Sequence, residues 1–306
     1  MMESVFLWGF AMAAAPFFSA VILKVKAFFG GKQGPPLLIH YHTLVKLFKK
    51  GSVYSTSTTF IFKLGPLVSL CAAVTALMFL PIAGRPPMVS FSGDILFVLY
   101  LLGLGRFFTI AAAMDTASPF EGMGAAREAY FPIICEATFF MILILFYRMT
   151  GELRLAAYFS GTQPLGLWRM AGSPLLFVVI SLFILLLSEN SRVPVDDPAT
   201  HLELTMIHEV MVLDHSGPDF GFIELAAAFK LFFYAALVAR LAVPVDVGHP
   251  VGSGGAFIAA LLAVYAAVGV TESVTARYRM DRVPRFVLTS FALAFFATVI
   301  TLEFIK

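Results

Sequence analysis

Charged side chains inside apolar blocks are the residues of this sequence best suited to chemistry. Arg106, Glu136, Glu224 and Lys230 lie within such blocks, and Glu189 lies at the end of one. A charge in a bilayer is costly, so such residues usually face the interior of a helix bundle or a water-filled cavity, where they often carry protons or ions. We therefore interpret the five as a candidate proton pathway. The structural alternative is a set of ion pairs that only holds helices together.

Arg106 and Glu136 are predicted to lie at matching depth. Each is about six or seven residues from the same end of its block, which is roughly 10 Å at ~1.5 Å rise per residue. An unpaired charge at that depth would be expensive, so we expect the two side chains to face each other or to share a polar pocket. Apolar surroundings and a cationic neighbour act in opposite directions on a carboxyl group, and that balance suits a proton carrier.

A charged stretch at residues 189–217 separates two long apolar blocks. Pro194 and Pro198 prevent a helix from running straight through it, and apolar residues at helical spacing follow, which predicts an extended segment and then a short amphipathic helix. Its acidic residues extend the candidate proton pathway, whereas its arginine and histidines, together with Arg127, are candidates for docking a partner protein. The acidic residues are Asp196, Asp197, Glu203, Glu209 and Asp214, and the docking candidates are Arg127, Arg192, His201, His208 and His215.

The histidines of this stretch are spaced by seven residues. Neighbours at that spacing are ~10 Å apart along a helix axis, so they cannot share one metal. Zincin motifs, phosphate-binding glycine loops and nucleophile elbows are absent, and Cys71 and Cys135 are too few for an iron–sulfur cluster, which needs about four thiolates. We expect no catalytic centre, no cofactor and no metal bound by this chain, and no nucleic acid among its partners.

The composition indicates what positions these residues. Only 13% of the residues are charged and the mean hydropathy is +0.89, whereas about a quarter of residues are charged in soluble domains. Spanning segments in lipid must be helices unless they close into a barrel. We predict an all-α polytopic membrane protein, a single integral membrane domain over residues 1–306 with eight transmembrane helices. The predicted spans are 4–23, 64–83, 94–113, 130–148, 173–190, 219–243, 254–272 and 284–303.

The loops between these spans carry an uneven positive charge. Most lysines and arginines fall in one set of loops, which the positive-inside rule places in the cytoplasm, with both chain termini outside. The first of these loops contains a segment, 37–50, whose apolar and basic positions are typical of a short amphipathic helix in the interface plane. A basic anchor that merely binds lipid is the alternative. The predicted cytoplasmic loops are about 24–63, 114–129, 191–218 and 273–283.

Three motifs resemble a known family over nearly the whole chain. The turn Gly34-Pro35-Pro36 precedes a helix that ends in lysines, and SPFEGMGAAREAYFPIICE places Arg127 and Glu136 nine residues apart. The third motif comprises Arg192, Pro194, Asp196, Glu203, Leu204, Ser216 and Gly217. Together they resemble subunit 1 of respiratory complex I, the bacterial H-type subunit, and the related membrane anchor subunits of formate hydrogenlyase and other energy-converting nickel–iron hydrogenases.

Departures from the complex I pattern favour the hydrogenase branch. Val195, Ala199 and His201 replace a phenylalanine and two acids of the quinone-type pattern, and Asp214-His215 replaces Glu-Tyr. The resemblance then implies a membrane anchor that docks a soluble nickel–iron hydrogenase arm and couples its electron transfer to proton or sodium movement. The alternative is the quinone-site subunit of a complex I-type NADH:quinone oxidoreductase, and a CO-linked hydrogenase is a further branch.

The same resemblance implies the surroundings of the chain. It predicts the inner (cytoplasmic) membrane, with hydrogenase large and small (iron–sulfur) subunits, antiporter-like membrane subunits and the lipid bilayer as partners. The nickel–iron centre and the iron–sulfur clusters would belong to the partner subunits. A secondary transporter would show inverted repeats and span-breaking Gly/Pro pairs in both halves, which are not clear here. A purely structural anchor is the remaining alternative.

Overall fold

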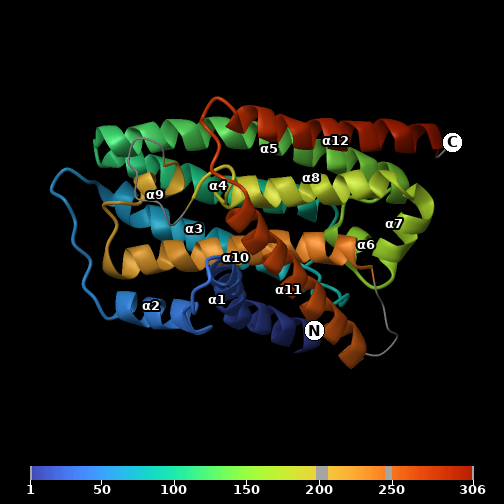
Figure 1. Cartoon of the computed structure of the whole chain (residues 1–306), viewed down its shortest axis with the longest axis horizontal. Helices are drawn as coiled ribbons and strands as arrows, with labels where there is room; N and C mark the ends of the chain where they lie inside the picture. The colour runs from blue at the N-terminus through green and yellow to red at the C-terminus, as the bar shows by residue number, and fades with distance from the viewer. Residues whose placement is uncertain (1, 198–205, 245–249, 305–306) are drawn as a thin grey trace.

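The computed structural model describes residues 2–197, 206–244 and 250–304, and these ranges form twelve helices and no strand (Figure 1). Seven of the helices are long and apolar enough to cross a membrane. They are α1 (Met2–Phe29), α3 (Phe60–Met78), α4 (Asp94–Asp115), α5 (Pro119–Thr150), α10 (Gly217–Ala242), α11 (Pro250–Val274) and α12 (Val283–Phe304). The prediction of an all-helical, multi-pass membrane protein is confirmed.

Five shorter helices connect the long ones within the described ranges. They are α2 (Ile39–Phe48), α6 (Leu155–Phe159), α7 (Gln163–Ala171), α8 (Pro174–Glu189) and α9 (His208–Met211). The predicted eighth span corresponds to α8, which has 16 residues. At ~1.5 Å per residue it is about 24 Å long, shorter than the ~30 Å hydrocarbon core. Eight membrane crossings therefore stay a prediction.

Helix α5 begins much earlier than the sequence analysis placed it. Ser118 has extended backbone and Pro119 opens the helix, which suits proline because the first helical position needs no N–H partner. Residues 119–129 are thus helical and not a loop, as the sequence analysis had them. The predicted amphipathic helix near residue 200 is seen only as the single turn α9, and Pro198, His201, Glu203 and Leu204 lie outside the described residues.

Helix α10 is the centre of the bundle. Of its most apolar window 67% is buried, against 33–44% for the other candidate spans, and it packs against α1, α2, α3, α8 and α11. The helices α5, α8, α10 and α12 run along the long axis, and α11 crosses them obliquely (Figure 1). The predicted cytoplasmic helix α2 and the turn α9 lie at one end of the bundle, opposite α6 and α7.

Small residues let α3 and α4 pack closely. A Cβ on Gly65 would lie 2.8 Å from the Cβ of Ala112, and one on Gly105 would lie 3.3 Å from the Cβ of Ala72. Both distances are shorter than ordinary van der Waals contact, so the two glycines are what this approach requires. The close packing fixes α4 against the bundle and brings Arg106, the neighbour of Gly105, toward α5, α8 and α10.

Candidate functional site

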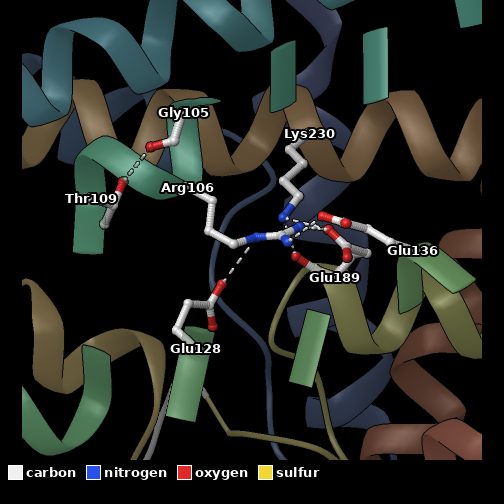
Figure 2. Close-up of polar contacts among 7 residues, drawn as sticks. All are labelled: Gly105, Arg106, Thr109, Glu128, Glu136, Glu189 and Lys230. Carbon is white, nitrogen blue, oxygen red and sulfur yellow. Dashed lines mark hydrogen bonds and ion pairs between the residues drawn. The ribbon is translucent and has the colours of Figure 1, made fainter. Parts of the chain in front are cut away.

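Arg106 on α4 is the centre of a buried charge cluster (Figure 2). Its Nη2 lies 2.5 Å from Oε2 of Glu189, its Nη1 lies 3.5 Å from Oε1 of Glu136, and its Nε lies 3.7 Å from Oε1 of Glu128. The carboxylates come from α5 and from the end of α8. The predicted pairing of Arg106 with Glu136 is confirmed, and Glu189 is the closest of the three partners.

Glu189 is the last residue of α8, where the helix dipole is negative and a carboxylate is unfavourable. Two cations compensate for this position, because Arg106 pairs with Glu189 on one side and Lys230 Nζ from α10 lies 3.1 Å from its Oε2 on the other. Lys230 also donates to the backbone carbonyl of Glu189 and so caps the helix end. The short helix α8 therefore ends inside the bundle, against α4 and α10.

The cluster has more acids than bases. Glu128, Glu136 and Glu189 share Arg106 and Lys230, so two positive charges face three carboxylates and leave one excess negative charge when all are ionised. Glu136 is half-exposed, so the excess charge lies at the edge of the cluster, and nearby carboxylates resist being ionised together. One proton or one further cation neutralises the cluster. A proton can bind to any of the three carboxylates. The arrangement can therefore hold and release a proton.

A cavity of about 90 Å³ adjoins the cluster. A buried water needs about 10–15 Å³ of such space and two to four polar partners, so the cavity has room for several waters. Side chains and backbone line it from α3, α4, α5, α8, α9, α10 and the segment after α8. Five of the predicted site residues contribute to its wall: Arg106, Glu189, Arg192, His208 and Lys230. We call it the central cavity.

Glu136 lies at the edge of this arrangement. Its side chain is 51% exposed, whereas that of Arg106 is 12% exposed, and it is not in the cavity wall. We expected apolar surroundings around Glu136, and the structure places it on the outer surface of α5 instead. It therefore connects the Arg106 cluster to the outside of the chain, where lipid or another subunit would lie.

The segment that follows α8 is non-helical and buried. Asp196 is 1% exposed; its Oδ1 pairs with Arg277 at 2.8 Å, and its Oδ2 accepts from the backbone N–H groups of Ile207 and His208 at 3.0 and 3.1 Å. Irregular backbone at membrane depth is tolerated where it is buried in protein or lines a water-filled cavity. Asp196 thus holds the turn α9 in place, and Asp197 follows it with its N–H donating to the Asp196 carboxylate.

The docking candidates turn inward. Arg192 lies 3.4 Å from Glu272, which Lys26 also contacts at 2.9 Å, and Arg127 donates to the carbonyl of Met206 at 2.8 Å. His208 lines the central cavity. These contacts tie loops and helices of the same chain together, and the docking role of these residues stays a prediction.

His215 is 7% exposed and stacks on Phe62, with ring centroids 3.9 Å apart and an interplanar angle of 11°. Burial lowers its pKa to about 4, although Asp219 acts in the opposite direction. The imidazole is thus neutral at pH 7 and belongs to the packing between the start of α3 and the loop before α10. A histidine in a polar stretch suggested a surface position, and the structure corrects this.

The remaining predicted residues that the structure describes lie outside the wall of the central cavity. Glu209 on α9 is partly buried, and burial raises its pKa. Asp214 is exposed, and its backbone N–H donates to the carboxylate of Glu121 at 3.2 Å. Glu224 faces α2 and lines a second, smaller cavity. His201 and Glu203 lie outside the described residues, so their roles stay predictions.

Two acids of α5 were missed by the sequence analysis. Glu128 belongs to the Arg106 cluster, and Glu121 is 1% exposed beside the loop before α10. Both fell in a predicted loop, because the helix was expected to begin near residue 130. Glu121, Glu128 and Glu136 are spaced by seven and eight residues, which places them near one face of a helix. That spacing is the signal that would have found them.

Metal-ligating side chains do not gather in the described part of the chain, where no group of three or more His, Cys, Asp or Glu residues could hold an ion.

Comparisons with known proteins identify the family of this arrangement. The sequence profile of the NADH dehydrogenase family matches residues 2–302. The chain belongs to this family. It is 26% identical over 294 residues to formate hydrogenlyase subunit 4 of Escherichia coli (strain K12), with 94% of each chain covered. It is also 27% identical to hydrogenase-4 component C of the same organism, covering 75% of this chain and 71% of that one.

More distant relatives belong to the quinone-type branch of the family. An NADH-quinone oxidoreductase subunit of Pelagibacter ubique (strain HTCC1062) is 24% identical over 277 residues, with 86% of this chain and 81% of the relative covered. Among solved structures, a chain of the archaeal membrane-bound sulfane sulfur reductase, a respiratory membrane complex, superposes with a TM-score of 0.82 over 98% of both chains at 20% identity. That likeness shows that the fold is shared.

Proposed function

We propose that this chain is the membrane anchor and ion-coupling subunit of an energy-converting hydrogenase of the formate hydrogenlyase type. The observation that carries the proposal is the Arg106 cluster, in which three carboxylates share two cations beside a cavity with room for several waters. Structural ion pairs alone would need neither an excess carboxylate nor an adjoining cavity. The similarity to formate hydrogenlyase subunit 4 over 94% of both chains supports this branch.

In this proposal, coupling works through competition for Arg106. Its three carboxylate partners lie at 2.5, 3.5 and 3.7 Å. A movement of the Arg106 guanidinium by about 1 Å would therefore change which carboxylate lies closest to it. The segment after α8 links the cluster to Asp196 and to the ion pair between Arg192 and Glu272. A change in the soluble arm that moves this segment would release a proton from one carboxylate and let another bind one.

Other subunits supply the redox chemistry in this proposal. The end of the bundle that carries α2 and α9 receives the soluble arm, with its hydrogenase large and small subunits and their nickel–iron and iron–sulfur centres. The half-exposed Glu136 on α5 faces the membrane subunits, of antiporter-like type, that complete the ion path. Both termini then lie on the side opposite α2 and α9, outside the inner membrane.

The runner-up function is the quinone-site subunit of an NADH:quinone oxidoreductase, which the likeness to the Pelagibacter protein favours. The chain departs from the quinone-type pattern at Val195, Ala199 and His201, and it matches formate hydrogenlyase subunit 4 over 94% of both chains. These two observations are why we place the hydrogenase branch first.

Affinity purification through a tag on this chain tests the proposal, followed by reconstitution of the whole complex into sealed vesicles. We expect the hydrogenase large and small subunits to co-purify and electron transfer to move protons or sodium ions across the membrane. Co-purification of flavin and quinone would favour the runner-up instead. An intact hydrogenase complex that evolves hydrogen but moves no ion would reduce this chain to a structural anchor.

A further inference from the structure

A second cavity, of about 10 Å³, lies beneath α2 and has space for about one water molecule. Its walls come from α1, α2 and α10, and we call it the α2 cavity. The residues that line it are Pro16, His40, Thr43, Leu44, Glu224 and Ala228. Two of these side chains, His40 and Glu224, are titratable, and neither belongs to the Arg106 cluster.

His40 gives the first sign that this cavity is occupied. Its Nε2 is buried and has no hydrogen-bond partner among the described residues, whereas buried polar atoms are nearly always paired with protein or with ordered water. Burial and the charge of Arg192 lower the pKa of His40, so its imidazole is neutral at pH 7. A water molecule in the α2 cavity would satisfy Nε2 and face the carboxyl group of Glu224.

Helix α10 separates the α2 cavity from the central cavity. Its residues Ile223, Ala227 and Lys230 line the central cavity, and Glu224 and Ala228 line the α2 cavity on a neighbouring face of the same helix.

Glu224 therefore lies at the water site beneath α2, on a helix whose neighbouring face forms part of the wall of the central cavity.

We propose that His40, one water molecule and Glu224 form a proton inlet that leads from the α2 side of the bundle to the central cavity. A proton that binds at Nδ1 of His40 releases another from Nε2 to the water, and the water passes one proton on to the Glu224 carboxylate. Each hop moves one proton and no electron, so no oxidant or reductant is needed. The volume of the α2 cavity excludes a quinone ring. The inference rests on the proposed ion-coupling function.

The test uses the whole complex in sealed vesicles, with ion movement and electron transfer measured separately. His40→Gln and Glu224→Gln keep size and hydrogen bonding but cannot relay a proton. If every proton passes the inlet, each variant should slow coupled proton uptake about tenfold, equivalent to ~1.4 kcal/mol in the barrier. The double variant should be no slower than either single one, because the two groups act in series.

Two further variants separate the inlet from general effects on α2. His42→Gln changes the same residue type on the same helix at an exposed position and should behave as wild type. Ala228→Leu should displace the water but keep both His40 and Glu224. It should therefore slow coupled proton uptake as much as His40→Gln does. Equal slowing by His42→Gln would overturn the inlet, since the effect would then belong to α2 as a whole.

The failure of the inlet can be told apart from the failure of the proposed function. If Glu136→Gln blocks ion movement while His40→Gln, Glu224→Gln and Ala228→Leu all leave it at the wild-type rate, the inlet is wrong and the coupling function stands. If Glu136→Gln also moves ions normally, an essential relay at Glu136 is contradicted, and the coupling function itself fails only if the intact wild-type complex moves no ions.

Discussion

The two ends of the helix bundle bury similar charged side chains in different ways. At the α6–α7 end, Arg240 is 4% exposed and donates to the carbonyls of Phe159 and Gly161 at 3.0 and 2.6 Å. Asp94, which is fully buried, accepts from the N–H of Leu155 at 2.8 Å. Each of these charges holds a loop by fixed hydrogen bonds, as expected of a structural role.

Toward the α9 end, the charges instead compete with one another. Arg106 divides its donors among three carboxylates at unequal distances, and a cavity adjoins the group. A buried charge with fixed partners gives rigidity, whereas a surplus of acceptors beside water gives a site whose protonation can change. The comparison separates charges with fixed partners, such as Arg240 and Asp94, from the Arg106 cluster, which we propose for ion coupling.

Replacing the buried arginine of the structural end should have the largest effect on stability. Arg240→Met leaves the carbonyls of Phe159 and Gly161 without their donor, and each buried acceptor left unsatisfied costs about 1–3 kcal/mol. Unfolding of the purified protein in detergent measures this loss. Arg169→Met, at an exposed position of α7, is the matched control and should change stability by less than about 0.5 kcal/mol. Equal effects would remove the distinction.

His215 should make stability depend on pH. Its folded pKa of about 4 lies below its ordinary value of 6.5, so the unfolded chain binds more protons between these values and stability falls as pH falls. Between pH 7 and pH 5 the loss should be about 2 kcal/mol. Denaturation at both pH values measures this loss. His215→Phe keeps the stacking on Phe62, and its free energy of unfolding should lack this part of the pH dependence. An unchanged slope would contradict the buried neutral histidine.

The smallest stability effect should come from removing the surplus acid. Glu128→Gln deletes one of three carboxylates that share two cations, so relief of repulsion offsets the lost pairing, and the expected change is within about 1 kcal/mol. Asp94→Asn is the comparison at the other end of the bundle. It replaces a carboxylate that has fixed partners, so it should lower the free energy of unfolding by more than Glu128→Gln does. A larger loss for Glu128→Gln than for Asp94→Asn would mean that the Arg106 cluster is structural.

The sequence predicted the parts of this picture that depend on rare residues in apolar blocks. Arg106 and Glu136 were predicted to pair because they lie at matching depth in their apolar blocks, and they do so at 3.5 Å. Glu128 was missed because the start of its helix at Pro119 was placed too late. Local sequence could not show that α8 ends inside the bundle, since only Arg106 and Lys230 from other helices compensate for the carboxylate at its end.

The long charged stretch was the hardest part to interpret from sequence. Its arginine and histidines were expected at a docking surface and its acids in a proton pathway, yet Asp196 and His215 are buried and Arg192 pairs with Glu272. Their partners, Arg277, Phe62 and Glu272, lie far away in the sequence. Burial that depends on such tertiary contacts produces no periodic pattern of apolar residues in the sequence. A charged stretch that folds into the bundle therefore has the same sequence pattern as a solvated loop.

The most direct test of the central claim is the number of ions moved per electron pair in the assembled complex with Glu136→Gln. Glutamine keeps the size of the side chain and can still hydrogen-bond, but it has no titratable proton. If the Arg106 cluster relays protons through Glu136, ion movement should fall to the background of the vesicles, while hydrogen evolution with an artificial electron donor and assembly of the complex persist. Unchanged ion movement in a stably assembled Glu136→Gln complex would contradict an essential relay at this position.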